Sequence, residues 1–149
     1  MERTLVLLKP DALQRAIAMQ ILQRFEQRGL RVIGLKLVAA SGEQASQHYA
    51  EHEGKFFFDG LVAHLQRGPI VAAVLEGPEA ISVVRAMVGA TRPHEASAGT
   101  IRGDLALAGL RNLVHASDAP ETAAREIAHW FSPDEVLDYD RALDQWVYE

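Results

Sequence analysis

Short, continuous runs of apolar residues alternate along the chain with segments in which apolar residues recur every three or four positions. Four of these runs are bounded by turn-forming or polar residues, which is typical of β-strands. The third run is apolar almost throughout, and this predicts a central strand that is buried on both faces. The four predicted strands are RTLVLL (3–8), LRVIGLKLVAA (30–40), PIVAAVLEG (69–77) and NLVH (112–115).

The segments between these runs have the periodicity of amphipathic helices. In the segment that begins at Ala12, an apolar residue recurs at every fourth position from Leu13 to Phe25, and Gly29 ends the pattern. We therefore predict one helix with a glycine C-cap. Ser41 and Gln44 have capping-box spacing, and the helix that they start is expected to reach about residue 51. Further helices are predicted over residues 56–68, 78–87 and 120–131, with another that begins at Ser132.

No linker, repeat or low-complexity tract divides the sequence, so we expect a single α/β domain over residues 1–149. Residues 90–99 have no clear period and contain Pro93 and Gly99, which indicates a loop. The alternation of strands and helices fits two topologies. One is a doubly wound parallel sheet, and the other is a split βαβ arrangement with an antiparallel sheet.

Composition narrows the class of protein. The 149 residues are 48% hydrophobic and 23% charged, which is ordinary for a globular protein and unlike a disordered one. A net charge of -5 argues against a dedicated nucleic-acid binder. The chain has no cysteine, which excludes a disulfide scaffold and a thiolate nucleophile. The N-terminal residues do not resemble a signal peptide and no apolar run is long enough to span a membrane, so we expect a cytoplasmic protein.

Polar residues that can carry chemistry lie at the ends of predicted elements and in loops. Neither of the glycine-rich phosphate-binding motifs is present, so any phosphate group must be bound by side chains. For several candidates an interpretation without any function stays open. Lys9 can be a solvated turn residue, Arg85 can extend along its helix to solvent, and Arg102 can be an exposed arginine in a turn. The candidates are Lys9, Tyr49, Arg85, Thr91, Arg102, Asn112, His115, Ser117 and Glu126.

Two other patterns suggest chemistry only weakly. His48 and His52 have the spacing of metal ligands on a helix, but without a third ligand we interpret them as two surface histidines. The three phenylalanines at 56–58 are more typical of a core than of a platform for stacking bases. Neither pattern by itself indicates a function.

His115 differs from these because it lies where a predicted strand ends and a helix follows. A neutral imidazole that is held in place and exposed can act as a nucleophile toward a phosphoryl group. Glu126 follows eleven positions later in the next predicted helix, where it can return to bind one ring nitrogen, and Ser117 can anchor that carboxylate. A purely structural histidine remains the alternative on these residues alone.

The segment NLVHASDA (112–119) resembles the active-site signature of nucleoside diphosphate kinases. The resemblance extends over essentially the whole chain, without an obvious insertion. The other matching segments are ERTLVLLKPDALQR, RFEQRGLRVIGLKL, QHYAEH, FFDGLV, GPIVAAVLEG, GATRP, GTIRGD and WVYE, in the order of the family.

The resemblance implies a fold, an activity and an assembly. The fold is a ferredoxin-like split βαβ sandwich, with a four-stranded antiparallel sheet covered by helices. The activity is transfer of the γ-phosphate of a nucleoside triphosphate, typically ATP, to a nucleoside diphosphate by a ping-pong mechanism through a phosphohistidine. Mg²⁺ is the implied cofactor, held mainly by the phosphates of the nucleotide. The implied assembly is a homo-oligomer, either a tetramer or a hexamer.

The resemblance also implies roles for individual residues. His115 is the implied nucleophile, oriented by Glu126 and Ser117, and Tyr49 lies beside it. Lys9 and Asn112 are expected at the sugar hydroxyls and a nearby phosphate oxygen. The expected contacts of the outer phosphates are Arg85, Thr91 and Arg102, and those of the base, which they sandwich, are Phe57 and Leu61.

Some positions depart from the family pattern. Ala116 replaces the usual glycine after the histidine, and Gly109-Leu110 stands where a small apolar residue and then a glycine are common. No departure removes a catalytic group, so we expect activity. The alternatives are a catalytically weak nucleotide-sensing subunit, a nucleic-acid-binding factor, and an assembly protein with a vestigial site. The retained His115 argues against the first, and the net charge of -5 against the second.

Overall fold

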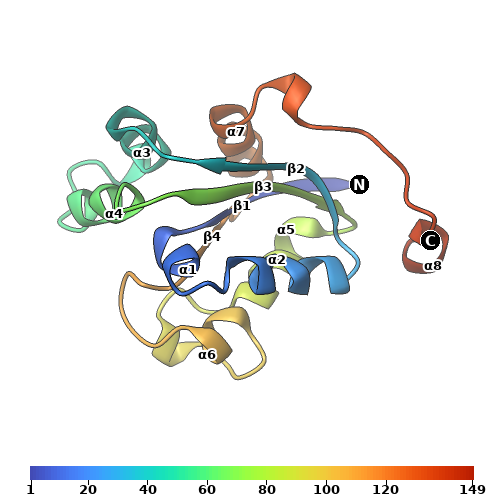
Figure 1. Ribbon diagram of the computed structural model, residues 1–149, viewed down its shortest axis with the longest axis horizontal. Coiled ribbons are helices and arrows are strands. Elements are labelled where there is room, and N and C mark those ends of the chain that lie inside the picture. The colour runs from blue at the N-terminus through green and yellow to red at the C-terminus, as the bar shows by residue number, and fades with distance from the viewer.

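Four strands form one sheet in the computed structural model, which describes residues 1–149 (Figure 1). The sheet order is β2-β3-β1-β4, and each neighbouring pair is antiparallel. This decides between the two topologies in favour of the split βαβ arrangement. The strands are β1 (Glu2–Leu8), β2 (Arg31–Val38), β3 (Ile70–Gly77) and β4 (Val114–Ala116).

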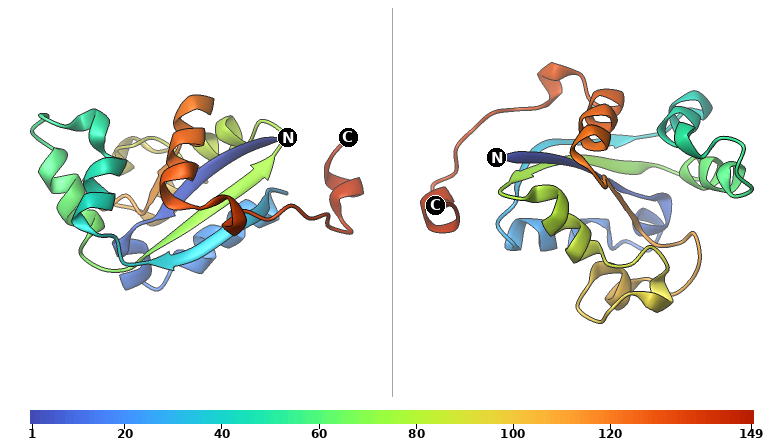
Figure 2. Two further views of the ribbon diagram at one scale, coloured as in Figure 1. Left: turned by 90° about the horizontal axis from the view of Figure 1, so that it is seen from above. Right: turned by 180° about the vertical axis from the view of Figure 1, so that it is seen from behind.

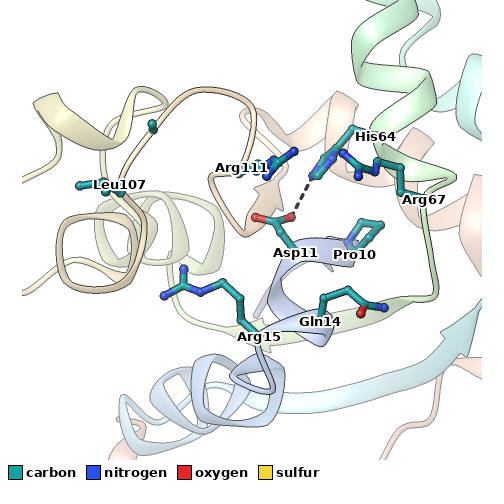
Figure 3. Close-up of a pocket in the computed structure, with 9 residues that line it drawn as sticks. Pro10, Asp11, Gln14, Arg15, His64, Arg67, Leu107 and Arg111 are labelled. Carbon is teal, nitrogen blue, oxygen red and sulfur yellow. Dashed lines mark hydrogen bonds and ion pairs between the residues drawn. The ribbon is translucent and has the colours of Figure 1, made fainter.

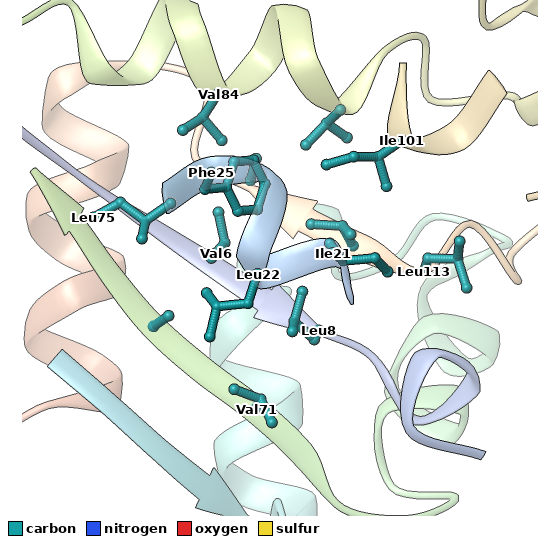
Figure 4. Close-up of a cluster of buried hydrophobic side chains, with 14 of the residues drawn as sticks. Val6, Leu8, Ile21, Leu22, Phe25, Val71, Leu75, Val84, Ile101 and Leu113 are labelled. Atoms are coloured by element: carbon teal, nitrogen blue, oxygen red, sulfur yellow. The ribbon is translucent and has the colours of Figure 1, made fainter. Parts of the chain in front are cut away.

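Helices cover both faces of the sheet, as Figure 2 shows. The cluster on one face packs α2, α5 and α6 against the strands (Figure 4), and the cluster on the other face packs α3, α4 and α7. No helix is long and apolar enough to cross a membrane. The helices are α1 (Pro10–Gln14), α2 (Ala18–Gln27), α3 (Gly42–His48), α4 (Phe58–Leu65), α5 (Ala80–Val88), α6 (Ile101–Leu105), α7 (Pro120–Trp130) and α8 (Asp144–Val147).

Burial on both faces explains why the central strands are continuous in apolar residues. In β1, Leu5 and Leu7 belong to one core cluster, and Val6 and Leu8 belong to the other. Successive residues of a strand point to opposite faces, and all four side chains are fully buried because helices cover both faces. All eight residues of β3 are buried as well, which confirms the prediction of a central strand.

The single helix predicted from Ala12 to Gly29 is wrong, because the chain forms two helices there. Ala16 has a φ of 57°, in the left-handed region that ends a helix. The amide of Ile17 donates to the carbonyl of Ala12, and the amide of Ala16 donates to that of Leu13, which is a Schellman motif. The sequence did not reveal this end because alanine, unlike glycine, is not a residue that indicates it.

Other boundaries also differ from the predictions. Residues 101–105 form α6 rather than a turn, and the Thr100 hydroxyl caps it by accepting from the Gly103 amide. The helix expected to reach residue 51 ends at His48, although its capping box between Ser41 and Gln44 is confirmed. The helix expected at Ser132 is a single 3₁₀ turn over Pro133–Glu135.

The C-terminal segment is tied to the body of the protein by two arginines. Arg31 forms ion pairs with Glu76 on β3 and with Asp144 on α8. Arg141 donates to the backbone carbonyls of Gly29 and Leu30. These contacts fix the terminal residues beside the start of β2.

The close packing of α6 generates a prediction about stability. A Cβ atom at Gly103 would overlap the backbone carbonyl of Ser97, so Gly103→Ala must separate α6 from the preceding loop. We expect it to lower the free energy of unfolding by about 1–3 kcal/mol, the usual cost of overpacking. Urea denaturation measures this effect. Gly60→Ala in α4 is the control, because its Cβ would meet only Leu110 at an ordinary 3.5 Å. Equal stability of the two variants would contradict the proposed overlap.

Candidate active site

One cavity brings together the residues that the sequence singled out for ligand binding. It has a volume of about 400 Å³ and lies beside β4, between α4, α5 and α6. Ser117 and Glu126 do not line it, since they are buried behind its wall. The predicted residues that line the cavity are Lys9, Tyr49, Phe57, Leu61, Arg85, Thr91, Arg102, Asn112 and His115.

His115 is the middle residue of β4, and its side chain is 23% exposed. Its Nε2 lies 2.5 Å from Oε2 of Glu126, whose carboxylate is 4% exposed. The other oxygen of Glu126 accepts a hydrogen bond of 2.6 Å from the Ser117 hydroxyl. Because Nε2 lies against the carboxylate, Nδ1 is the ring nitrogen away from this contact.

This arrangement follows from the turn between β4 and α7. Ser117 directly follows β4, with its amide donating to the Leu5 carbonyl of β1, and Pro120 opens the helix three residues later. The buried residues of α7 are Ala123, Glu126 and Trp130, which share one face of the helix. The face that packs on the sheet therefore carries Glu126 back to the histidine.

Lys9 is buried, so the alternative interpretation of Lys9 as a solvated turn residue is wrong. It is 4% exposed, and burial lowers the pKa of its ammonium group to about 8. Its Nζ donates to the backbone carbonyl of Leu110 at 3.2 Å, at the wall of the cavity. A buried cation with one neutral partner favours a bound anion, which would replace part of its lost hydration.

Arg102 is also buried, so the alternative of an exposed arginine in a turn is wrong. Its guanidinium donates to the backbone carbonyls of Gly89, Asn112 and Val114. Burial, and then the charge of Arg85, lower the pKa of Arg102 to about 10. The three bonds use three of its five N–H groups and leave two for a ligand.

The aromatic residues of the 56–58 run have three different environments. Phe56 is 98% exposed, Phe58 packs against a core cluster, and Phe57 lines the cavity with Leu61. The expectation of a core triplet is therefore correct only for Phe58. Tyr49 is buried at the end of α3, and burial raises the pKa of its hydroxyl.

The prediction of two surface histidines is wrong for His48. Its side chain is fully buried, whereas His52 is half-buried at the cavity wall. His48 Nδ1 accepts a hydrogen bond of 3.1 Å from Trp130 Nε1, and its ring meets that of His115 edge to face. The sequence reasoning missed His48 and Trp130, because spacing on α3 does not tell which face α7 covers.

The His48, His115 and Glu126 side chains also offer three metal-ligand atoms within 4.8 Å of one another. These atoms already have partners. His48 accepts from Trp130, and Glu126 binds both His115 and Ser117. The group is therefore a network of two hydrogen bonds and one close contact around His115 rather than a preformed metal centre.

A second pair that sequence reasoning missed supports the turn before His115. Leu113 has a φ of 72°, which strains a leucine, and its amide donates to Oδ2 of Asp11 at 3.0 Å. The other oxygen of Asp11 accepts from His64 Nε2 at 2.9 Å, in a neighbouring cavity shown in Figure 3. The turn residues Lys9-Pro10-Asp11 were the only signal for this contact.

Comparison with known proteins gives one family. The family model described as "Nucleoside diphosphate kinase" matches residues 2–136. A nucleoside diphosphate kinase of Roseiflexus sp. is 52% identical over 149 residues, which are 100% of both chains. One of Chloroflexus aurantiacus is 54% identical over 151 aligned residues, again over 100% of both chains.

Solved structures agree with this family. The halophilic nucleoside diphosphate kinase of Halobacterium salinarum, in complex with CDP, matches with a TM-score of 0.97 and 46% identity, over 99% of each chain. A nucleoside diphosphate kinase family protein of Babesia bovis matches with a TM-score of 0.96 and 44% identity. That match covers 99% of this chain and 100% of the other.

The support of Leu113 by Asp11 has a testable dependence on pH. Burial alone would raise the pKa of Asp11, but the hydrogen bond from His64 and the charge of Lys9 outweigh it and lower the pKa below 3.8. The ionised carboxylate therefore stabilises the fold at neutral pH, and this contribution disappears as the pH falls below about 3.8.

We expect Asp11→Ala to lower the free energy of unfolding at pH 7 by about 2 kcal/mol, because it leaves the Leu113 amide without an acceptor. At pH 3 the difference in the free energy of unfolding between Asp11→Ala and the wild type should be smaller than at pH 7. Urea denaturation at the two pH values measures it, with Asp138→Ala as a control at an exposed carboxylate. A difference independent of pH would show that the charge of Asp11 does not support the turn.

Proposed function

Because this chain belongs to the nucleoside diphosphate kinase family, it transfers the γ-phosphate of a nucleoside triphosphate to a nucleoside diphosphate, and we propose that His115 carries that group between the two nucleotides. The observation that carries the proposal is the contact of 2.5 Å between His115 Nε2 and the buried carboxylate of Glu126. It leaves Nδ1 as the reactive nitrogen at the wall of a cavity lined by cations.

The first half-reaction is an in-line displacement at the γ-phosphorus. The lone pair of His115 Nδ1 forms the N–P bond while the bond from phosphorus to the bridging oxygen breaks, and the nucleoside diphosphate leaves. The ring gains positive charge, which Glu126 stabilises while it keeps the proton on Nε2. In the second half-reaction a terminal phosphate oxygen of the acceptor attacks the same phosphorus, and His115 is the leaving group.

The phosphates are bound by the cationic side of the cavity in this proposal. Arg85 and the two remaining N–H groups of Arg102 bind the outer phosphates, and Thr91 adds a neutral hydroxyl. The bonds from Arg102 to three carbonyls hold its guanidinium in place before the substrate arrives. Such preorganisation stabilises the charge that develops on the transferred group.

The sugar is bound by Lys9 and Asn112. The amide nitrogen of Asn112 donates to the Thr91 carbonyl, and its oxygen Oδ1 is buried without a partner. A buried acceptor without a donor is costly, and a sugar hydroxyl is a suitable donor. Tyr49 lies beside the reacting histidine at the cavity wall. Because Lys9 and Asn112 form polar contacts with the sugar, the site is more selective for the sugar than for the base.

The base is held by stacking between Phe57 and Leu61, both at the cavity wall. Every base presents a flat face, so contacts of this kind support broad base specificity. Leu110, at the Gly109-Leu110 departure from the family pattern, lines the same cavity. Its side chain reaches to 3.5 Å from the position of a Cβ atom on Gly60, so it closes the space beside α4.

Mg²⁺ is the cofactor in this proposal. The cavity is lined by three cations, Lys9, Arg85 and Arg102, and by only two carboxylates, Glu51 and Asp118. This set fits a metal ion that arrives on the nucleotide phosphates, with Asp118 placed to bind it through water, and does not fit a dedicated protein cage. When bound, Mg²⁺ neutralises phosphate charge. The chain's own residues then orient the phosphates toward His115.

A labelling experiment tests the role of His115. Purified protein is mixed with γ-³²P-labelled ATP and Mg²⁺ without an acceptor, beside His115→Ala and a sample with the metal chelated. We expect an acid-labile, base-stable label on the wild type alone, which a nucleoside diphosphate removes. No label on the wild type would contradict the nucleophile assignment and favour the alternative of a nucleotide-sensing subunit.

The same proposal includes the extent of the domain and its location. The family model ends at residue 136, and the bonds of Arg31 and Arg141 support including residues 137–149 in the same domain. A cytoplasmic location, which the sequence favours, is also part of the proposal, and cell fractionation tests it.

We also propose that copies of the chain associate along β2. This strand is at one edge of the sheet, and the C-terminal segment pairs with only its first part, through the Leu137 amide and the Ile33 carbonyl. Beyond that point Leu35 and Leu37 are 52% and 65% exposed. An unpaired edge with exposed leucines favours an isologous contact with a second copy. Such a dimer is the unit from which a tetramer or a hexamer is built.

Charges on this edge test the association. We expect the double variant Leu35→Lys, Leu37→Lys to sediment as a smaller species than the wild type at micromolar concentration, because charges on an edge strand oppose pairing. Phe56→Lys is the control, since Phe56 is 98% exposed at a site away from β2. A wild type that sediments as a monomer would exclude the proposed contact.

A further inference from the structure

One fully buried ionisable side chain at the active site has no part in the mechanism above. His48 is the last residue of α3, and its side chain has no exposure to solvent. It lies between Trp130 and His115, with ring centroids 5.7 Å and 4.4 Å away. A polar ring at such a place is costly to bury unless its contacts compensate.

The protonation state of His48 follows from its neighbours. Burial, and then the charges of His115, His129, Lys9 and Arg125, lower the pKa of His48 to about 2, so the ring is neutral. The indole N–H of Trp130 can only donate, and it points at His48 Nδ1 at 3.1 Å. The single proton of the ring is therefore on Nε2, and Trp130 fixes the position of the ring.

The orientation of His115 needs more than its contact with Glu126. A contact at Nε2 fixes one atom of the ring and leaves the ring plane free to tilt about that atom. His48 meets the His115 ring edge to face, with an angle of 85° between the ring planes. A second contact of this kind restricts the tilt and so determines where Nδ1 points.

We propose that His48 is a positioning residue that holds the plane of the His115 ring, with Trp130 as the anchor of His48. This inference rests on the proposed role of His115 as nucleophile. A ring that is aimed at the phosphorus before the substrate binds increases the rate of transfer, because misplacement of a reacting atom by about 1 Å can cost about a hundredfold.

The neutrality of His48 serves the same purpose. Its Nδ1 is 3.7 Å from Oε2 of Glu126, the oxygen that contacts His115. A cation at that position would compete with His115 for the carboxylate. A neutral ring that already accepts from Trp130 leaves the negative charge of Glu126 to the nucleophile.

The test measures the rate at which γ-³²P-labelled Mg-ATP phosphorylates the protein in a single turnover at saturating nucleotide. ADP affinity and the melting temperature are measured beside it. We expect His48→Ala to slow labelling at least tenfold, while the Kd of ADP stays within about twofold. His129→Ala is the matched control, because His129 also joins α7 to α3, through the Gln44 carbonyl, but makes no contact with His115. This control should label within about twofold of the wild type.

A double variant separates positioning from general packing. His48→Phe with Trp130→Phe restores a flat ring beside His115 and removes both partners of the buried hydrogen bond, so neither is left unsatisfied. We expect it to recover most of the rate lost in His48→Ala. The labelling rate of this double variant also tests the role of His48 if His48→Ala does not fold.

Each result has a distinct meaning. A wild type that takes no label contradicts the proposed function itself. A wild type that labels normally, with His48→Ala at the same rate, overturns only the role of His48. Equal slowing by His48→Ala and His129→Ala, or a folded double variant that labels as slowly as His48→Ala, would assign the effect to packing between α3 and α7 and also overturn it.

Discussion

A single buried carboxylate connects the parts of this protein that matter for its chemistry. Glu126 is 4% exposed, and a charge so far from water needs partners. One carboxylate oxygen accepts a hydrogen bond from Ser117, and the other contacts His115, two residues earlier in the chain. The position of Glu126 on the buried face of α7 ties His115, the proposed nucleophile, to the core that this helix forms with the sheet.

Other residues of the site and of the turn before it are polar groups that are removed from water and bonded to the backbone. Lys9 donates to one carbonyl, Arg102 donates to three, and Asp11 accepts from the strained turn at Leu113. Two apolar clusters, one on each face of the sheet, supply the stability that such a site needs. These bonds hold the polar groups in place before a nucleotide binds, which suits a reaction that depends on positioning.

Much of this arrangement could be predicted from local sequence, and the failures have physical causes. The period of apolar residues continues across the end of α1, because both helices face the same sheet, so it hid the break at Ala16. Residues 101–105 are too few to show a period, and α6 was missed. His48 looked like a surface residue because the spacing of histidines does not report the helix that covers them.

The sequence by itself determined the four strands, most of the helices, the resemblance to a family and the residue types around the histidine. These depend on local periodicity and on motifs that keep their spacing. The residues alone left two topologies open and the resemblance implied the antiparallel one, which the tertiary structure shows. Only the tertiary structure decided that Glu126 contacts Nε2 of His115 and that Asp11 supports the turn before it. The physical reason is that these features are contacts between residues on different elements of the fold. The packing of the helices on the sheet brings those residues together.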